Sequence, residues 1–254
     1  MTTNQKSAHA SKFLSQLELP EVDTSLATVF RPEAAAFKAG TEGAAANAGS
    51  LVSFVSGLTE IHKSDVLNST LLAQLAASKQ HDRFKDTMNW YNFYIGVLAQ
   101  VGWTIPAFAF RDYSPSGASL VLSDAVLDIL SAVATGDEMN ILRATLSSLR
   151  DKPGNEGPLT LFDQQSFPEN IGTFQIFPVA EDDGQLVMAM SAMQFNAQKH
   201  VTRFLWWSWT STSVKLQQSA QKAVLNEDLY RQVRQQVIDK LGDRARQFIK
   251  DIEI

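Results

Sequence analysis

The sequence contains no cysteine among its 254 residues. That absence excludes disulfides, thiolate nucleophiles, cysteine metal sites and S-acylation, although it leaves the cellular compartment open. Glycine and proline number only 13 and 8, so collagen-like and low-complexity chains are excluded as well. Basic residues are fewer than acidic ones, 22 against 27, for a net charge of -5. A nucleic-acid partner is not expected from that balance, because general nucleic-acid binders carry a basic surface.

Long apolar runs are also lacking, so the sequence predicts no constitutive transmembrane helix. The nearest approach is the uncharged segment 87–110, which contains Asn89, Gln100 and Pro106. We interpret it as a buried helix leading into an extended segment, with a membrane-convertible segment as the minority alternative. The polar start, 1–12, has no signal-peptide core. We therefore expect synthesis in the cytoplasm, with non-classical release and membrane association left open.

Recognisable catalytic motifs are missing too: there is no G-x-S-x-G, P-loop, G-x-G-x-x-G or H-E-x-x-H pattern. None of the four histidines has the spacing of a metal-binding pair. The sequence thus predicts no catalytic residue, no metal site and no enzyme. An active site assembled from distant residues remains an alternative, and a contact between His200 and a strand serine would be its first sign.

What is present is a mixture of helical and β patterns in one α+β domain over 1–254. A mostly helical part covers 1–155, and a β-meander with C-terminal helices covers 156–254. Hydrophobic spacing and capping residues predict helices at 7–17, 33–58 with a break near 40–43, 65–78, 82–102, 124–134, 137–150, 226–241 and 243–249. The uncharged segment 44–58 is rich in small residues, which suits close helix packing in a core or in lipid.

The β patterns gather in the second half. Strands are predicted at 173–180, 186–195 and 201–216, and the first two are joined by a hairpin turn at Asp183-Gly184. Two shorter strands are predicted at 107–113 and 119–122. Three long adjacent strands with short turns form an antiparallel meander, so the fold class is an antiparallel β-meander sheet wrapped by α-helical layers.

Aromatic residues concentrate at one place, Phe204, Trp206, Trp207 and Trp209. On a strand, Trp207 and Trp209 share one face and Phe204 and Trp206 share the other. The simpler interpretation is a central strand buried between two layers. The alternative is that one face lines an apolar pocket or meets lipid, because tryptophan is favoured at membrane interfaces.

Positive charge gathers around the same cluster. No acidic residue occurs between Asp183 and Glu227, whereas this stretch contains Lys199, Arg203, Lys215 and Lys222. A cationic sheet edge on an acidic protein suits anionic phospholipid headgroups. Lysine that protects a strand edge against aggregation explains the pattern equally well.

Three features together resemble the Erwinia virulence factor group, which is distantly related to the cytolytic (Cyt-type) delta-endotoxins. They are the segment Trp90–Tyr94 with Gly102-Trp103, the three-strand meander, and the tail Leu225–Tyr230 followed by Lys240–Asp243. The resemblance covers the chain from about residue 50 and implies a cytolysin-like fold that binds or perturbs membranes in virulence towards insects. The Erwinia protein carries a fatty acyl chain on a cysteine, which this sequence cannot do.

We therefore expect a non-enzymatic, lipid- or membrane-interacting protein of the toxin or virulence type. The expected contacts are Trp206, Trp207, Trp209 and Phe204 on the apolar side and Lys199, Arg203 and Lys215 for headgroups. The expected partner is anionic membrane lipid, with a homo-oligomer on the membrane as an option. No cofactor is expected apart from a bound fatty acid or lipid. A protein-interaction or assembly module is the second hypothesis, and the enzyme with a site built from distant residues is the third.

Overall fold

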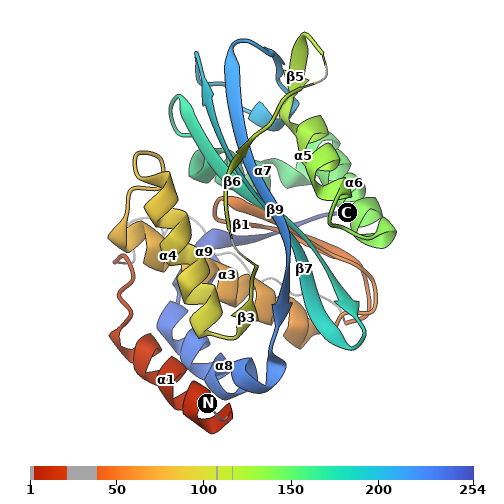
Figure 1. Cartoon of the computed structure of the whole chain (residues 1–254). Helices are drawn as coiled ribbons and strands as arrows, with labels where there is room; N and C mark the ends of the chain where they lie inside the picture. The colour runs from red at the N-terminus through yellow and green to blue at the C-terminus, as the bar shows by residue number, and fades with distance from the viewer. Residues whose placement is uncertain (1–2, 22–38, 107, 116) are drawn as a thin grey trace.

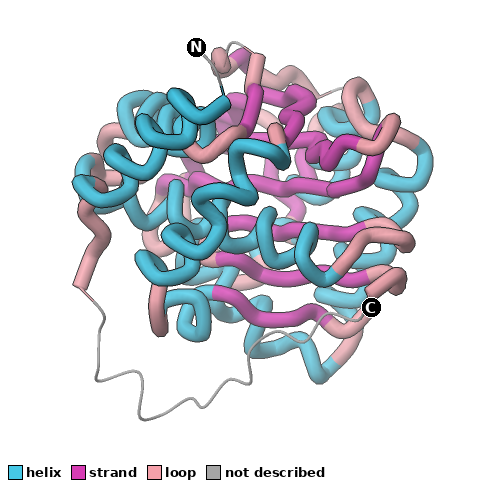
Figure 2. Tube along the Cα trace, turned by 90° about the horizontal axis from the view of Figure 1, so that it is seen from below, coloured by secondary structure: helices cyan, strands magenta, loops and turns pink. Residues whose placement is uncertain are grey.

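The computed structural model describes residues 3–21, 39–106, 108–115 and 117–254. Its centre is an eight-stranded sheet with the strand order β10-β1-β2-β6-β7-β9-β3, and β4 also pairs with β9. Helices pack on both faces of this sheet (Figures 1 and 2). All strand pairs except β2–β6 are antiparallel. The α+β class with a largely antiparallel sheet and helical layers is thus confirmed.

The long strands β6 (Ile171–Asp182), β7 (Gln185–Ala197) and β9 (Val214–Leu225) form the expected meander. β6 and β7 turn at Asp183 and Gly184, whose φ angles are 49° and 72°. An Asp-Gly pair is favoured there because both central residues of this hairpin turn have positive φ. The two predicted strands and their turn are therefore confirmed, and each strand extends a few residues further than predicted.

The predicted third strand, 201–216, is wrong in position. The structure has a short 3₁₀ helix, η2 (Phe204–Trp206), and a short strand, β8 (Ser208–Thr210), before β9 begins. β8 pairs with β5 (Ser119–Val121) in a separate two-stranded sheet, so the short strand predicted at 119–122 is confirmed. Arg203 adopts a left-handed φ of 55°, which bends the chain out of the extended conformation. The aromatic residues therefore do not alternate across one strand.

The helix predicted for 44–58 is also wrong. This segment forms β1 (Gly43–Asn47) and β2 (Ser50–Phe54), a hairpin whose second strand pairs in parallel with β6. Every residue of β2 is buried because helices cover both sides of the sheet. A strand buried on both faces gives a continuous apolar run that periodicity alone does not distinguish from a helix. The part of the prediction that falls on 33–38 lies outside the described residues.

The sheet edges come from short segments far apart in the chain. β10 (Ile249–Ile252), which was not predicted, pairs with β1 at one edge, and β3 (Trp103–Thr104) pairs with β9 at the other. Of the strand predicted at 107–113, only β4 (Arg111–Asp112) is paired, and residue 107 lies outside the described residues. The connection before β4 is held instead by aromatic packing on α4.

One helical layer packs on the sheet face that carries Phe177, Met188 and Leu225. It consists of α1 (Thr3–Gln16), α3 (Glu60–Gln80), α4 (Thr87–Gln100), α8 (Glu227–Leu241) and the short α9 (Arg244–Phe248). Figure 1 shows α1, α4 and α8 together on one side of the long strands. The helices predicted here are confirmed in existence, and α3 is longer than expected.

The other layer packs on the face that carries Phe174, Met193 and Leu216. It consists of α5 (Leu122–Ser131), α6 (Gly136–Asp151), the 3₁₀ turn η1 (Pro153–Asn155) and α7 (Glu156–Ser166). α7 was not predicted, because its residues lie where the β character was expected to begin. It places Phe162 in a cluster of phenylalanine rings beneath η2.

The helices begin only in part at the capping residues that the sequence predicted. Asn226 caps α8 as expected and accepts a hydrogen bond from the backbone N–H of Leu229 at 3.0 Å. α3 and α6 begin earlier than predicted, at the N-caps Thr59 and Thr135, in place of Ser64 and Asp137. The predicted cap Asp82 lies in a turn before α4, and α5 follows Val121 without a side-chain cap.

None of the helices in the described ranges combines the length and apolar character that crossing a bilayer requires. The assignment of 1–254 to a single domain stays a prediction. Strands from both halves of the chain share the main sheet, since β2 pairs with β6 and β10 pairs with β1.

Candidate functional site

The predicted contact residues lie mainly on the connection between β7 and β9, and we call residues 198–209 the aromatic loop. Its shape depends on Asp163 of α7, whose Oδ2 accepts the backbone N–H of Arg203 at 2.5 Å. The left-handed Arg203 then leads into η2, which points Phe204 and Leu205 into the core. β5 pairs with the end of the loop and fixes its exit.

The aromatic side chains of the loop divide into buried and exposed ones. Phe204 is fully buried among Phe162 and Phe174, and Trp209 is only 4% exposed. Trp206 is half-buried against the same core. Trp207 is 42% exposed and is the only exposed tryptophan among the described residues. Of the four predicted apolar contacts, Trp207 alone is largely available to a bilayer in this conformation, and Phe204 and Trp209 are core residues.

Lys199 lies directly beside the exposed tryptophan. Its ammonium nitrogen is 4.8 Å from the ring centroid of Trp207, which is a cation–π contact. Trp207 and Trp209 meet edge to face at 6.5 Å, so the buried ring supports the exposed one. An amphipathic ring with an adjacent cation is the combination that membrane interfaces favour.

The other cations of the predicted positive stretch are dispersed. The Arg203 guanidinium donates to Glu156 at 3.1 Å and to the carbonyl of Arg150, so its charge is paired within the protein. Lys215 is exposed on β9 near the same end of the sheet. Lys222 lies toward the opposite end of β9 and pairs with Asp182 at 3.6 Å. The stretch is therefore not one continuous patch.

Asp163 is the residue of this region that the sequence analysis missed. Burial raises the pKa of its carboxyl group to about 6, and this effect exceeds the opposing influence of the Arg203 backbone N–H and the nearby positive charges. Its second oxygen, Oδ1, is buried without a hydrogen-bond partner. No sequence signal marked Asp163, because its helix was not predicted.

The contact with a strand serine that would have supported an enzyme does not form at His200. Its ring stacks on Phe167 at 5.2 Å, and within the described ranges no hydrogen bond joins it to a serine. The same ranges contain no group of three or more histidine and acidic side chains arranged to hold a metal ion.

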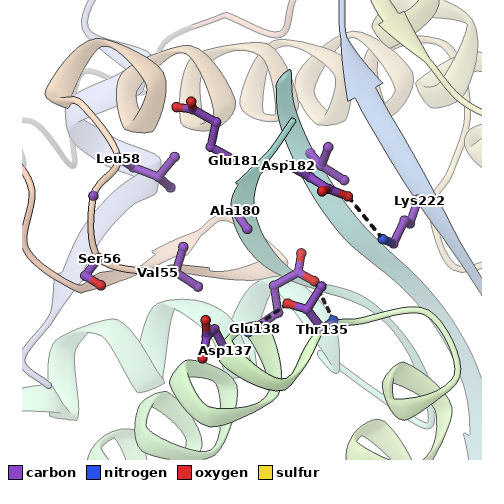
Figure 3. A pocket seen from close by; sticks show the side chains of 12 residues that line it. Val55, Ser56, Leu58, Thr135, Asp137, Glu138, Ala180, Glu181, Asp182 and Lys222 are labelled. Atoms are coloured by element: carbon purple, nitrogen blue, oxygen red, sulfur yellow. Dashed lines mark hydrogen bonds and ion pairs between the residues drawn. The ribbon is translucent and has the colours of Figure 1, made fainter. Parts of the chain in front are cut away.

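A cavity of about 430 Å³ lies at the other end of the long strands (Figure 3). Its walls come from the loop after β2, the start of α6 and the ends of β6 and β7, with Lys222 of β9. The sequence analysis did not predict it. The pattern Thr135-x-x-Glu138, which starts α6, was the available signal, because it is typical of a capping box.

The comparisons with known proteins gave similar solved structures only. No protein-family model and no curated protein sequence matches the chain. A solved structure titled as a delta-endotoxin aligns with a TM-score of 0.40 and 11% identity, over 82% of this chain and 90% of that one. One titled as the Evf virulence factor aligns with a TM-score of 0.39 and 10% identity, over 86% and 90%. These titles name the same two groups as the sequence resemblance.

Proposed function

We propose that this protein interacts with anionic membrane lipid and acts in virulence or intoxication without catalysing a reaction. The toxin and virulence class, and insects as the target, rest on the sequence resemblance. The lipid interaction rests on one observation, the exposed Trp207 ring with the Lys199 ammonium over it. A bound fatty acid and an oligomer on the membrane remain separate expectations.

The position of this pair supports a peripheral contact. The aromatic loop joins the end of β7 to the start of β9, and the exposed Lys215 lies at the same end of the sheet. Trp207 packs on Trp209, which is anchored among Phe167 and Phe195. A rigid base of this kind lets the ring enter the headgroup region without first ordering a mobile loop.

Deeper insertion would require part of the fold to rearrange. Phe204 and Trp209 would reach lipid only if η2 left its aromatic core, and Arg203 ties this loop to α7 through Glu156. The uncharged α4 and the long strands are the other segments that a lytic state would have to move. Surface binding therefore precedes any lysis in this proposal.

The first test compares Trp207→Ala with Ile238→Ala in vesicle flotation. Both residues are exposed and apolar, but Ile238 lies on α8, which follows the end of β9, whereas the aromatic loop precedes the start of β9. Losing the interfacial contact of one tryptophan removes about 1–2 kcal/mol, so Trp207→Ala should bind phosphatidylglycerol-containing vesicles about tenfold more weakly. Ile238→Ala should bind like the unmodified protein.

Lys199→Gln supplies the electrostatic half of the test. It should weaken binding to anionic vesicles and reduce its dependence on salt, because one headgroup attraction is removed. Unchanged binding by a folded Trp207→Ala protein would show that this site is wrong. An oligomer that forms with rising protein concentration and ignores vesicles would favour the assembly module instead.

A further inference from the structure

The cavity at the far end of the sheet is lined by both aliphatic and acidic side chains. Val55, Leu58, Ala180 and Val187 supply aliphatic surface. The charged part of the lining consists of four carboxyl groups and one amine, which belong to Asp137, Glu138, Glu181, Asp182 and Lys222. Lys222 pairs with Asp182 at 3.6 Å, and His62 Nδ1 lies 4.0 Å from Glu181 Oε2. Among the described residues, Asp137 and Glu138 are therefore the two carboxyl groups of the cavity without an ion pair.

Helix capping explains part of this acidity. Thr135 and Glu138 form a capping box, in which the Thr135 hydroxyl accepts from the Glu138 N–H at 3.3 Å and Glu138 Oε2 accepts from the Thr135 N–H at 2.7 Å. Asp137 also suits the first turn, where acidic residues are favoured by the helix dipole. The capping box uses only one of the two oxygens of Glu138.

The other oxygen of Glu138 points to a ligand. The residue is 1% exposed, and Oε1 has no hydrogen-bond partner. Figure 3 shows the Glu138 carboxyl group rising from α6 into the cavity, toward Ala180 and Asp182. A buried carboxylate oxygen without a donor is costly, because its desolvation is not compensated by a hydrogen bond. A donor that enters the cavity would remove this cost.

We propose that this cavity binds a small organic amine with an aliphatic body. The ammonium group would donate to Glu138 Oε1 and be attracted by Asp137 and Glu181, while the alkyl chain would lie on Val55, Leu58 and Val187. A bare divalent ion fits less well, because the described residues hold no three-ligand metal group. The site is separate from the aromatic loop, since Val187 is near the start of β7 and the loop follows its end.

The experiment is calorimetric titration of the full chain with n-hexylamine, and with hexan-1-ol and hexanoate as probes of the same chain length. We expect hexylamine to bind and the alcohol and the carboxylate to bind at least tenfold more weakly. Glu138→Gln keeps a side-chain oxygen for the capping box but removes the charge, and it should weaken hexylamine binding tenfold or more. Lys222→Gln should strengthen it, because it removes the competing cation.

Glu169→Gln is the matched control, since Glu169 is exposed just before the opposite end of β6 and lines no part of the cavity. It should bind hexylamine as the unmodified protein does. If Glu138→Gln does not fold by circular dichroism, Glu181→Gln takes its place with the same expected direction. The proposal is overturned if hexylamine does not bind, if hexanol binds as tightly, or if the folded variants at Glu138 and Glu181 retain full affinity.

Discussion

A single glycine shows how closely this core is packed around a buried charge. The Arg83 guanidinium donates to the Gly49 carbonyl at 3.2 Å and to Gln175 Oε1 at 2.9 Å, and it lies 4.7 Å from the Trp90 ring centroid. A Cβ atom on Gly49 would be 2.1 Å from Arg83 Nη1. Gly49 is therefore required for space, because arginine approaches the turn between β1 and β2 directly.

Gly49→Ala should consequently destabilise the protein by about 2–3 kcal/mol, since it displaces a buried guanidinium from its hydrogen bonds to Gly49 and Gln175. Gly96→Ala is the matched control: Gly96 is exposed inside α4, and nothing lies within 4 Å of its added Cβ. That change should stabilise the helix by up to about 1 kcal/mol. Urea unfolding of both variants measures the difference, and equal effects of the two substitutions would contradict this packing.

At the scale of elements, Asp163 connects α7 to the aromatic loop through a carboxyl group whose pKa is raised. Burial raises its pKa to about 6 in the folded protein, above the usual value of 3.8. Between about pH 4 and pH 6 the folded chain keeps a proton that the unfolded chain has lost. The stability contributed by this group is therefore present at the acid end of this window and is lost as the pH rises through it.

Asp163→Asn should remove this dependence while leaving an oxygen that accepts the Arg203 N–H. The stability of the variant relative to the unmodified protein should rise by about 1–2 kcal/mol as the pH is raised from 4 to 7. This figure allows for the part of the side chain that water reaches. Urea unfolding at these two pH values measures it. If the variant and the unmodified protein differ in stability by the same amount at pH 4 and at pH 7, Asp163 titrates as an ordinary surface carboxyl group.

The elements also show where sequence reasoning succeeds. β6 and β7 were predicted because an Asp-Gly turn separates two runs of β character, and α8 because Asn226 caps a clear apolar spacing. β1 was missed because it is rich in alanine and almost wholly buried, and β2 because all its residues are buried, so neither shows the alternation of a half-exposed strand. β2 is held in the sheet by pairing with β6, more than 100 residues away, and β1 pairs with β2.

The sequence revealed which aromatic residues the candidate site contains but not how they are arranged. The cluster of tryptophans was visible, yet its geometry depends on the left-handed Arg203 and on Asp163 of an unpredicted helix. Trp207 is exposed and Trp209 buried for that reason, although both were placed on one strand face. The acidic cavity was hidden in the same way, because it joins the loop after β2, the start of α6, the β6–β7 hairpin and β9, which are four separate stretches of the chain.

On the scale of the whole molecule, the long strands separate two different ends. One end carries Trp207 and Lys199, the combination that we assign to anionic membrane. The other carries the acidic cavity, which we assign to an amine. The two helical layers cover the faces of the sheet between these ends.

The most direct test of the membrane assignment measures vesicle binding and dye release together. Phosphatidylcholine vesicles with and without phosphatidylglycerol would be compared at low and at physiological salt. We predict binding that requires the anionic lipid and weakens as salt increases, because exposed charges are screened. Dye release would mark a lytic rearrangement in addition. Absence of binding to both kinds of vesicle at low salt would show that the membrane assignment is wrong.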